Sequence, residues 1–204
     1  KPKTIFMSNE FIKQKIKKEK FHPGILGFFI NYNYLIRKSI RLAIKQNASK
    51  LDGALLDFGC GTKPYKKLFV NTKEYIGIDL KIEGREESHI YVDEFYDGKV
   101  IPYENDKFDS LLCTEVLEHV FNIDELLKEF NRVLKKGGKA LITTPFMWEE
   151  HEMPYDFARY TTPALQFLYE KNGFQVIDNF KTGNYIEVIF QFSLNYIKNI
   201  LPNN

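Results

Sequence analysis

The sequence has 204 residues, of which 44% are hydrophobic and 27% charged, as in an ordinary globular chain long enough to bury a core. The net charge of +2 gives no argument for a nucleic-acid partner, and no apolar stretch is long enough to span a bilayer. Cys60 and Cys113 do not suggest a disulfide framework and no signal-peptide pattern opens the chain, so we expect reduced thiols and a cytoplasmic protein.

The first fifty residues are predicted to form a helical extension. Lysine dominates residues 1–20, which indicates a solvated helix or, alternatively, a segment that contacts an acidic surface such as anionic lipid headgroups. From about Phe28 to Ala48, apolar residues recur at near-helical spacing and predict a second, longer helix.

The stretch from Leu55 to Thr62 organises the rest of the chain. Apolar residues run into Asp57 and two glycines then flank one small residue, which predicts a buried strand ending in a tight turn that opens a helix. A second apolar run ends in Asp79. Doubly wound folds bind nucleosides with such a turn and with an acid, after the next strand, that accepts hydrogen bonds from ribose hydroxyls.

Strand-like and helix-like segments then alternate, which predicts an α/β fold with a mostly parallel central sheet and helices on both faces. We place the core at residues 51–182, between the N-terminal extension (1–50) and an apolar C-terminal segment (183–204). The expected strands are 54–58, 74–79, 89–93, 108–113, 139–144 and 174–178, and the expected helices are 64–69, 124–135 and 163–171.

The C-terminal segment is rich in large apolar side chains. Three structures are considered for it, in this order: a helix that caps the sheet or forms a dimer surface, a strand at Ile186–Phe192, and a helix in a membrane interface. The membrane helix comes last because such helices have a strongly charged face and this segment has little charge.

Four segments in order resemble motifs of the class I S-adenosylmethionine-dependent methyltransferases: residues 56–62, Asp79, 108–113 and 134–139. The dinucleotide fingerprint would place a third glycine where Pro64 stands, so a nucleoside without phosphates is favoured over a pyrophosphate. The resemblance, strongest to the type 11 and ubiquinone-pathway branch, covers about residues 51–180. It implies a Rossmann-like methyltransferase fold, S-adenosylmethionine as cofactor and S-adenosylhomocysteine as product.

The resemblance also assigns roles to residues that follow the strands. The glycine turn would surround the methionine part of the cofactor, with Thr62 assisting, and Asp79 would hold the ribose. The N-terminal helix would act as a lid, with Tyr34 and Arg37 near the methionine carboxylate, although aromatic packing and a solvated arginine explain them equally well. The predicted cofactor-binding residues are Asp57, Gly59, Cys60, Gly61, Thr62, Asp79, Leu80, Asp93, Cys113, Thr114 and Glu115.

For the adenine amino group, the family places an acid after the third strand. We prefer Asp93 because it ends the run His89–Val92, whereas Asp97 before Gly98 has the character of a turn residue. Leu80 and Val116 are candidates for the apolar contacts with the adenine ring.

Glu115, Glu118 and His119 would share one face if the chain turns into a helix after the fourth strand. The segment resembles two metal-assisted branches, the ubiquinone-pathway O-methyltransferases and the RNA 3′-terminal 2′-O-methyltransferases, and His151 follows the fifth strand as a second histidine does in the latter. A divalent cation is therefore considered but not favoured, because metal-free relatives share the segment. The predicted catalytic residues are His151 as general base, His119 and Glu118.

Residues 146–160 are too polar for a buried loop and are predicted to bind the acceptor. Their aromatic rings offer flat faces to a sugar or another ring, and Arg159 can hold an anionic group. The alternative is a lid closed by its own Asp156–Arg159 pair and by aromatic packing. The aromatic residues are Trp148, Tyr155 and Tyr160.

The sequence thus predicts an S-adenosylmethionine-dependent methyltransferase that acts on a hydroxyl of a sugar or surface-glycan precursor, the acceptor being suggested by resemblance to bacterial polysaccharide enzymes. The alternatives are a metal-assisted O-methyltransferase acting on a phenol, a quinone precursor or an RNA end, a nicotinamide-dependent oxidoreductase, and a non-catalytic nucleoside-binding module. DNA is not expected as a partner and RNA is disfavoured by the charge balance. Peripheral membrane contact or a homodimer through the C-terminal segment stays open.

Overall fold

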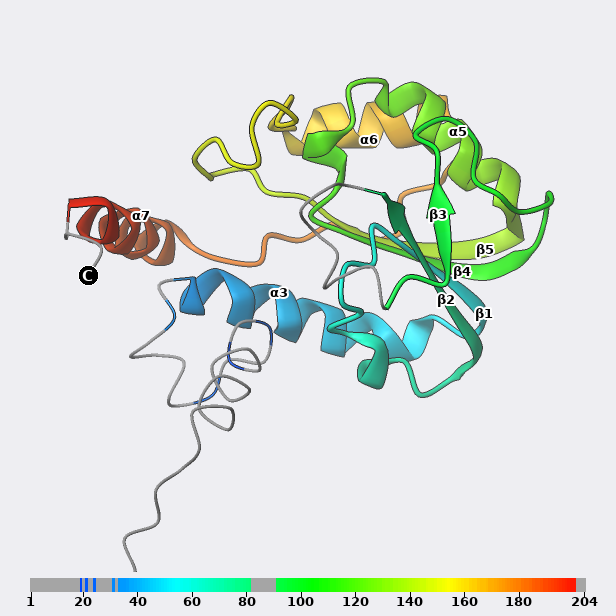
Figure 1. Ribbon diagram of the computed structural model, residues 1–204, viewed down its shortest axis with the longest axis horizontal. Coiled ribbons are helices and arrows are strands. Elements are labelled where there is room, and N and C mark those ends of the chain that lie inside the picture. Colours follow the sequence, from blue (N-terminus) through cyan, green and yellow to red (C-terminus); the bar gives the residue numbers. More distant parts are fainter. Residues whose placement is uncertain are drawn as a thin grey trace, which may run out of the picture. The chain divides into compact units, whose positions relative to one another are not determined.

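The computed structural model describes residues 33–81 and 91–200, together with Glu19, Phe21, Gly24 and Asn31. The chain forms two compact units. We call Ile44–Phe180 the core unit, and Lys1–Ala43 with Lys181–Asn204 the terminal unit. The core unit contains the sheet and the candidate site (Figure 1).

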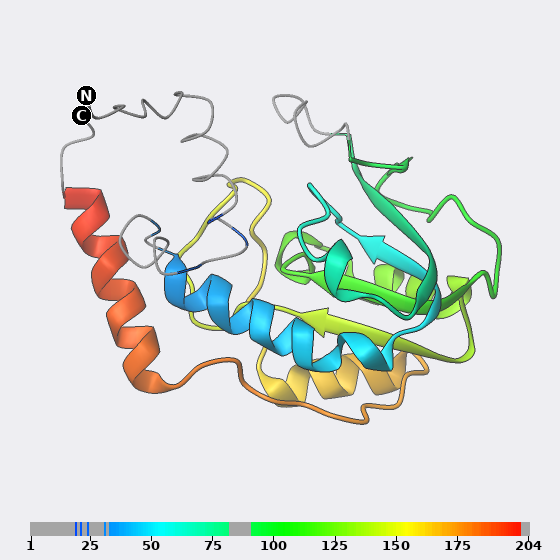
Figure 2. The same cartoon turned by 90° about the horizontal axis from the view of Figure 1, so that it is seen from below.

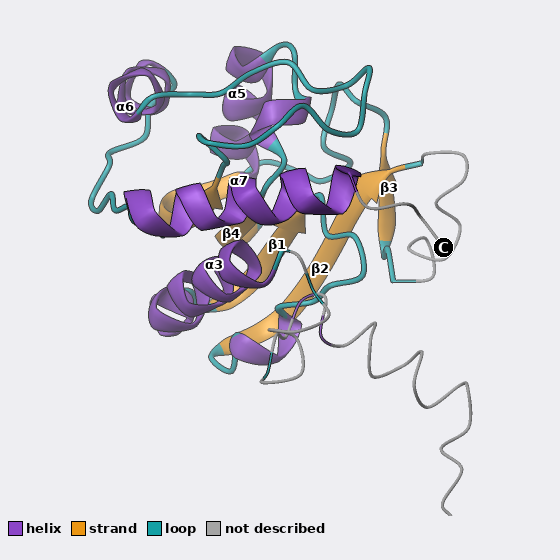
Figure 3. Cartoon of the chain, turned by 90° about the vertical axis from the view of Figure 1, so that its left-hand side faces the viewer, coloured by secondary structure: helices purple, strands orange, loops and turns teal. Residues whose placement is uncertain are grey.

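The core unit is built on a five-stranded sheet whose pairings are all parallel (Figure 3). Its order is β3-β2-β1-β4-β5, so the chain moves outward on one side of β1 and then returns to pair on the other. The carboxyl ends of β1 and β4 flank this change of direction, where open α/β sheets bind ligands. The strands are β1 (Gly53–Phe58), β2 (Thr72–Leu80), β3 (Glu94–Tyr96), β4 (Phe108–Thr114) and β5 (Leu134–Thr143).

Apolar side chains cover both faces of the central strands, as parallel sheets require. Leu55 and Leu56 of β1 point to opposite faces, and neither has exposed surface. Helices α5 (Ile123–Val133) and α6 (Thr162–Lys171) cover one face, while the last turn of α3 (Tyr34–Asn47) and the 3-10 helix η2 (Lys66–Leu68) lie on the other (Figure 1). The predicted α/β fold with helices on both faces is confirmed.

Helix α5 shows how the sequence dictates this packing. Its buried positions recur at three- and four-residue spacing and form one apolar face, and each such side chain contributes about 1.5–3 kcal/mol when fully buried. The helix was expected to run to residue 135, but it ends at Val133 and β5 begins at the next residue. Gly137 has a positive φ of 79°, which is common for a glycine that ends a helix, but here it lies within β5. The buried positions are Ile123, Leu126, Leu127, Phe130 and Val133.

Three predicted core elements differ from the structure. The helix expected at 64–69 is only the single turn η2, which follows Lys63 at a φ of 50° and Pro64. The strand expected at 89–93 is wrong in its described part, because β3 begins at Glu94; residues 82–90 lie outside the described residues. The strand expected at 174–178 is a loop that pairs with no strand.

The terminal unit contains α3 up to Ala43, and α7 (Tyr185–Ile200). Helix α3 lies within the predicted helix over 28–48, whose first residues mostly fall outside the described ones, as do residues 1–18. Helix α7 confirms the helical prediction for the C-terminal segment and rules out a strand at Ile186–Phe192. Within the described residues no antiparallel strand joins the sheet, and no helix has the length and apolar character to cross a membrane.

Candidate active site

The glycine turn after β1 is tied to the end of β2 by backbone hydrogen bonds. The amides of Gly59 and Cys60 both donate to the carbonyl of Ile78, at 2.9 and 3.0 Å, and the amide of Gly61 donates to Oδ2 of Asp79 at 2.8 Å. Gly59 and Gly61 have φ values of 69° and 48°, which glycine adopts without a Cβ penalty. The turn and the acid predicted to bind a nucleoside therefore form one hydrogen-bonded structure.

The two glycines have different surroundings. A Cβ on Gly59 would lie 2.4 Å from Cγ2 of Val116, so this glycine lets the turn pack against the segment after β4. A Cβ on Gly61 would meet nothing within 4 Å, so a ligand can approach the main chain there. This open approach fits the methionine part of a nucleoside cofactor.

Asp79 is the half-buried acid near the end of β2. One carboxylate oxygen accepts from the Gly61 amide and the other accepts from the Leu80 amide, each at 2.8 Å. A carboxylate offers about four acceptor sites, so two remain for the vicinal hydroxyls of a ribose. Leu80 is 43% exposed beside it, and offers an apolar surface to a base.

Several other predicted cofactor residues turn inward. Asp57 is 3% exposed and accepts a hydrogen bond from the Tyr75 hydroxyl at 2.6 Å. Burial raises the pKa of Asp57 to about 7, against the lowering effect of the Tyr75 bond. Cys60 is also buried, and Cys113 has no exposed surface, so the Cys113 side chain belongs to the core and not to the direct contacts with a ligand.

The adenine acid must be reconsidered, because Asp93 precedes β3 and does not end it. Its carboxylate accepts hydrogen bonds from the Lys63 ammonium and the Gly77 amide. Burial raises the pKa of Asp93, but these hydrogen bonds outweigh it and the net shift is downward. The residue directly after β3 is Asp97, whose Oδ1 accepts from the amides of Lys99 and Val100. The reason for preferring Asp93 was therefore wrong, and the same criterion now selects Asp97.

Glu115 turns the chain out of β4 and is not part of the group whose donor atoms converge. It has a positive φ of 54°, its amide donates to the Thr143 carbonyl, and the Thr143 hydroxyl donates to Oε1 of Glu115 at 2.8 Å. The predicted shared helical face is wrong, because only the 3-10 helix η3 (Leu117–His119) follows. Thr114 lies at the end of β4, with Glu115 next to it, beside the glycine turn.

Glu118, His119 and His151 do come together. Nε2 of His119 lies 3.7 Å and Nε2 of His151 3.9 Å from Oε1 of Glu118, and one donor atom from each residue lies within 4.8 Å of the others. Glu118 has no exposed surface, and neither of its oxygens has a hydrogen-bond partner. A point within about 2.8 Å of all three atoms therefore exists, which is hydrogen-bond distance for an oxygen atom.

Both imidazoles are oriented by their other nitrogen. Nδ1 of His119 lies 2.7 Å from the carbonyl of Tyr155, which can only accept. Nδ1 of His151 lies 3.2 Å from Oδ2 of Asp156 and 3.3 Å from the carbonyl of Glu149. The Tyr155 carbonyl places the proton of His119 on Nδ1, so the lone pair of its Nε2 faces Glu118. Nδ1 of His151 also lies 3.4 Å from a terminal nitrogen of Arg159, which can only donate, so either tautomer of His151 has a partner at Nδ1.

The environment of Glu118 favours a neutral carboxyl as long as no positively charged group lies beside it. Burial raises its pKa to about 8, and the charge of Glu115 adds to this effect. A protonated imidazole or a cation between the three groups would reverse the balance, since an opposite charge at this distance favours the carboxylate.

The segment after β5 carries His151 and lies beyond the carboxyl end of that strand (Figure 2, yellow). The Phe157 amide donates to the Glu118 carbonyl at 2.8 Å and fixes the segment to η3. Arg159 donates from both terminal nitrogens to Asp156, at 2.6 and 2.7 Å, and these bonds hold the pKa of Asp156 well below its usual range. The predicted Asp156–Arg159 pair is thus present, and Arg159 already has an anionic partner.

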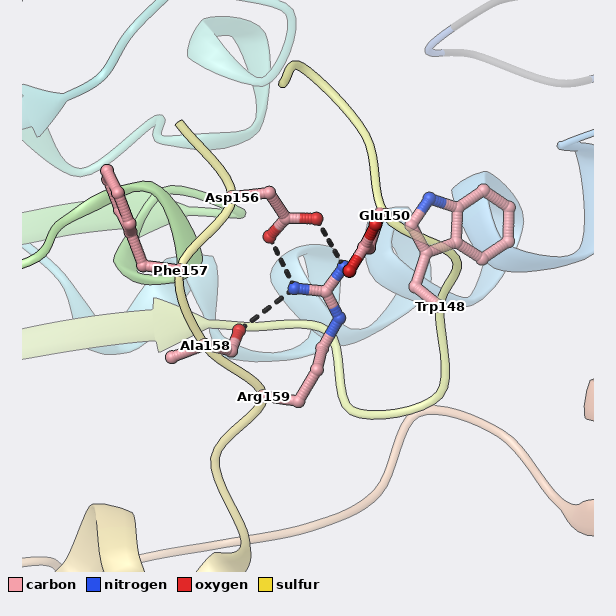
Figure 4. Close-up of a pocket in the computed structure, with 6 residues that line it drawn as sticks. All are labelled: Trp148, Glu150, Asp156, Phe157, Ala158 and Arg159. Carbon is pink, nitrogen blue, oxygen red and sulfur yellow. Dashed lines mark hydrogen bonds and ion pairs between the residues drawn. The ribbon is translucent and has the colours of Figure 1, made fainter. Parts of the chain in front are cut away.

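A cavity of about 190 Å³ opens on this segment (Figure 4). The Asp156–Arg159 pair lies in its centre, with the Trp148 ring and the Glu150 carboxylate to one side and the Phe157 ring to the other (Figure 4). Sequence reasoning missed Glu150 and Phe157, which only the course of the loop brings to the cavity. It also missed Lys63, whose ion pair with Asp93 depends on an unexpected positive φ.

The fold and the site define a nucleoside-binding α/β enzyme with an acid–imidazole cluster next to the binding turn. Residues 30–191 match the family described as methyltransferase domain. The chain is 29% identical over 165 residues to an uncharacterized protein of Methanocaldococcus jannaschii, covering 76% of this chain and 70% of that protein. It is 32% identical over 81 residues to human mitochondrial 2-methoxy-6-polyprenyl-1,4-benzoquinol methylase, covering 40% of this chain and 21% of the human protein.

Solved structures share the fold. A S-adenosylmethionine dependent methyltransferase from Mesorhizobium loti gives a TM-score of 0.57 at 13% identity, covering 83% of this chain and 93% of that one. A SAM dependent methyltransferase from Archaeoglobus fulgidus gives a TM-score of 0.55 at 15% identity, covering 92% of this chain and 94% of that one. The chain belongs to the methyltransferase domain family and is a class I enzyme that uses S-adenosylmethionine.

Proposed function

We propose that the chain methylates a hydroxyl group, with His151 as the general base, and that the acceptor is a sugar or glycan precursor. The convergence of Glu118, His119 and His151 beside the glycine turn carries this proposal. When bound, S-adenosylmethionine supplies a methyl group already activated by its sulfonium. The protein then has to bind, align and remove a proton.

The binding roles follow from the turn after β1. The Gly61 main chain offers open space for the methionine part, Asp79 has two free acceptor positions for the ribose, and Asp97 is the acid that directly follows β3. These residues hold the cofactor at the carboxyl edge of the sheet. Because Val116 packs on Gly59, the cluster that begins two residues later lies next to this edge.

The proton-transfer roles follow from the two oriented imidazoles. The acceptor hydroxyl would occupy the point between the three groups, and its proton would pass to Nε2 of His151, whose side chain is 28% exposed. His119 would hydrogen-bond the same oxygen, and Glu118 would stabilise the imidazolium that forms. Glu118 has no exposed surface, so it acts through the histidines as a positioning residue.

The acceptor class is supported by the cavity in Figure 4. A flat indole face beside the carboxylate of Glu150 offers apolar and hydrogen-bonding contacts together, which a sugar ring requires. The volume is below the roughly 300–1,000 Å³ of sites for drug-sized ligands, so the cavity fits one part of a larger acceptor.

The test is methyl transfer from labelled S-adenosylmethionine to a panel of sugar nucleotides and lipid-linked glycans. We expect label in a methyl ether of at least one acceptor, a loss with His151→Ala, and unchanged cofactor binding by that variant. Label only in amines or in phenols would overturn the sugar proposal, and unchanged turnover of His151→Ala would remove the base.

A second candidate is metal-assisted methylation of a phenol or quinol. The same three atoms could contract around a divalent cation, because two Nε2 lone pairs and a buried carboxylate are suitable ligands for zinc or manganese. A bound cation would lower the pKa of the acceptor hydroxyl. The human relative that is named as a benzoquinol methylase makes this acceptor worth testing.

Metal removal distinguishes the two candidates. If a cation acts, dialysis against a chelator abolishes turnover and added zinc or manganese restores it. If His151 acts alone, turnover is unchanged by the chelator. In both cases His151→Ala is inactive, so the comparison uses the wild-type enzyme.

A further inference from the structure

We propose that the terminal unit binds an anionic membrane surface through α7. The proposal goes beyond the methyl-transfer site, and no residue of that site takes part in it. It rests on two observations: the exposed face of α7 is apolar, and the terminal unit carries a large positive charge.

Helix α7 (red in Figure 1) has an inverted polarity for a protein in water. Gln191 and Asn195 are only 4% and 3% exposed, and the Gln191 amide donates to Oδ1 of Asn195 at 3.1 Å. Nine large apolar side chains on the same helix are exposed; Phe192 and Leu194 are 37% and 39% exposed, and seven others are 47% to 84% exposed. These seven are Tyr185, Ile186, Ile189, Phe190, Tyr196, Ile197 and Ile200.

These seven side chains share one face. At 100° per residue they fall within an arc of about 140°. Among the residues whose side chains the structure describes, only Ser193 is polar within this arc, and its hydroxyl donates to the Ile189 carbonyl at 2.9 Å. The Ser193 hydroxyl therefore stays satisfied when the face leaves water, and the hydroxyls of Tyr185 and Tyr196 suit the polar side of a membrane interface.

The charge of the chain is unevenly divided between the two units. The terminal unit has twelve lysines and arginines against three acidic residues, whereas the core unit has seventeen against twenty-four. The formal charges are therefore about +9 for the terminal unit and −7 for the core unit, and they sum to the net charge of +2. Seven of the terminal lysines fall within residues 1–20. Such asymmetry is typical of a segment that binds an anionic surface.

Together these features favour lipid over the other occupants. Two copies of a unit with this charge repel each other, which disfavours a dimer through α7. Nucleic acid would explain the positive charge but not the exposed isoleucines. Interfacial helices need cationic charge beside an apolar face, and α7 itself carries only Glu187 and Lys198. The terminal unit as a whole carries the cationic charge that the helix sequence alone lacks, which answers the objection drawn from that sequence.

The test is co-sedimentation of the full chain with vesicles of phosphatidylcholine, with and without one third phosphatidylglycerol. We expect binding to the anionic vesicles, weaker binding at high salt, and at least about a tenfold loss of binding for the double variant Ile189→Glu/Ile197→Glu. The matched control is Val70→Glu/Ile177→Glu, which adds the same charge at exposed apolar positions of the core unit and should bind like the wild type.

A second readout does not depend on the glutamate variant folding. In a Tyr196→Trp variant, brominated lipids should quench the added fluorescence, whereas the native Trp148 reports the background. The proposal is overturned if the wild type ignores anionic vesicles, or if both double variants lose binding equally. It is also overturned if an RNA oligonucleotide binds and vesicles do not, or if α7 forms a dimer that the glutamate variant dissociates without any vesicle binding.

Discussion

Asp79 and Glu118 are two acids at the same edge of the sheet with opposite surroundings. Asp79 is half-buried and each of its oxygens already accepts a backbone amide, so it is held in place with acceptor capacity to spare. Glu118 has no exposed surface, no hydrogen-bond partner and two imidazole nitrogens 3.7 and 3.9 Å away. Under the proposed function, Asp79 holds the cofactor and Glu118 stabilises the positive charge that forms on the imidazoles beside it.

The largest expected effect is a loss of turnover when an imidazole that faces Glu118 is removed. Replacing His151 by Ala should lower kcat by about 10²–10⁴-fold, because a positioned general base contributes that much. The affinity for S-adenosylmethionine should change little. Steady-state kinetics beside a binding titration measures both, and a variant that loses cofactor binding but not turnover when saturated would make His151 structural.

The next effect concerns Asp79, the acid proposed to bind the ribose. Asp79→Ala should weaken cofactor binding by about 1.5–3 kcal/mol for each charged hydrogen bond lost. Asp93→Asn and Asp97→Asn form a matched pair at the start and end of β3. We expect Asp97→Asn to weaken binding more, because Asp93 already pairs with Lys63; calorimetry that gives the reverse order would restore Asp93 as the adenine acid.

The glycine turn offers a comparison within a single loop. Gly59→Ala should destabilise the fold by about 1–3 kcal/mol, because the new methyl group overlaps Val116 and the backbone φ is positive. Gly61→Ala carries only the φ penalty and should mainly reduce cofactor affinity. Denaturant unfolding and calorimetry of both variants separate the two effects. Equal destabilisation would contradict the difference in their surroundings.

The smallest effect is a pH dependence of stability at Asp57. Because its folded pKa is raised to about 7 from an ordinary 3.8, the unfolded chain releases this proton first. The unfolded state therefore binds fewer protons between about pH 4 and 7, and this group makes the fold less stable as the pH rises through that window. Asp57→Asn should remove this loss of stability. The difference in the free energy of unfolding between Asp57→Asn and the wild type should therefore favour the variant more at pH 8 than at pH 4, as denaturant unfolding at the two pH values can measure.

The parts of the site that follow strands could be predicted from the sequence. The first strand, its glycine turn and Asp79 were expected together because the apolar pattern and the glycines act over short distances. The third strand was misplaced, since β3 has only three residues and no clear alternation. The run at 174–178 looked like a strand, but Ile177 is 76% exposed and no partner strand pairs with the segment.

The backbone path that brings His119 and His151 together could not be predicted, although both were expected, with Glu118, to be catalytic residues. His119 and His151 meet because a backbone bond from Phe157 to Glu118 and the Asp156–Arg159 pair fix the path of a long irregular segment. The burial of Gln191 and Asn195 on α7 was equally hidden, because an apolar count does not tell which face of a helix is exposed. The division into extension, core and C-terminal segment, and the cytoplasmic location, stay predictions.

The most direct test is a calorimetric titration of S-adenosylmethionine into the wild type, Asp79→Asn and Glu118→Gln. The different tasks of the two acids predict that Asp79→Asn binds at least about tenfold more weakly, as the loss of one charged hydrogen bond implies, while Glu118→Gln binds like the wild type. Wild-type affinity in Asp79→Asn, or an equal loss in Glu118→Gln, would contradict the account.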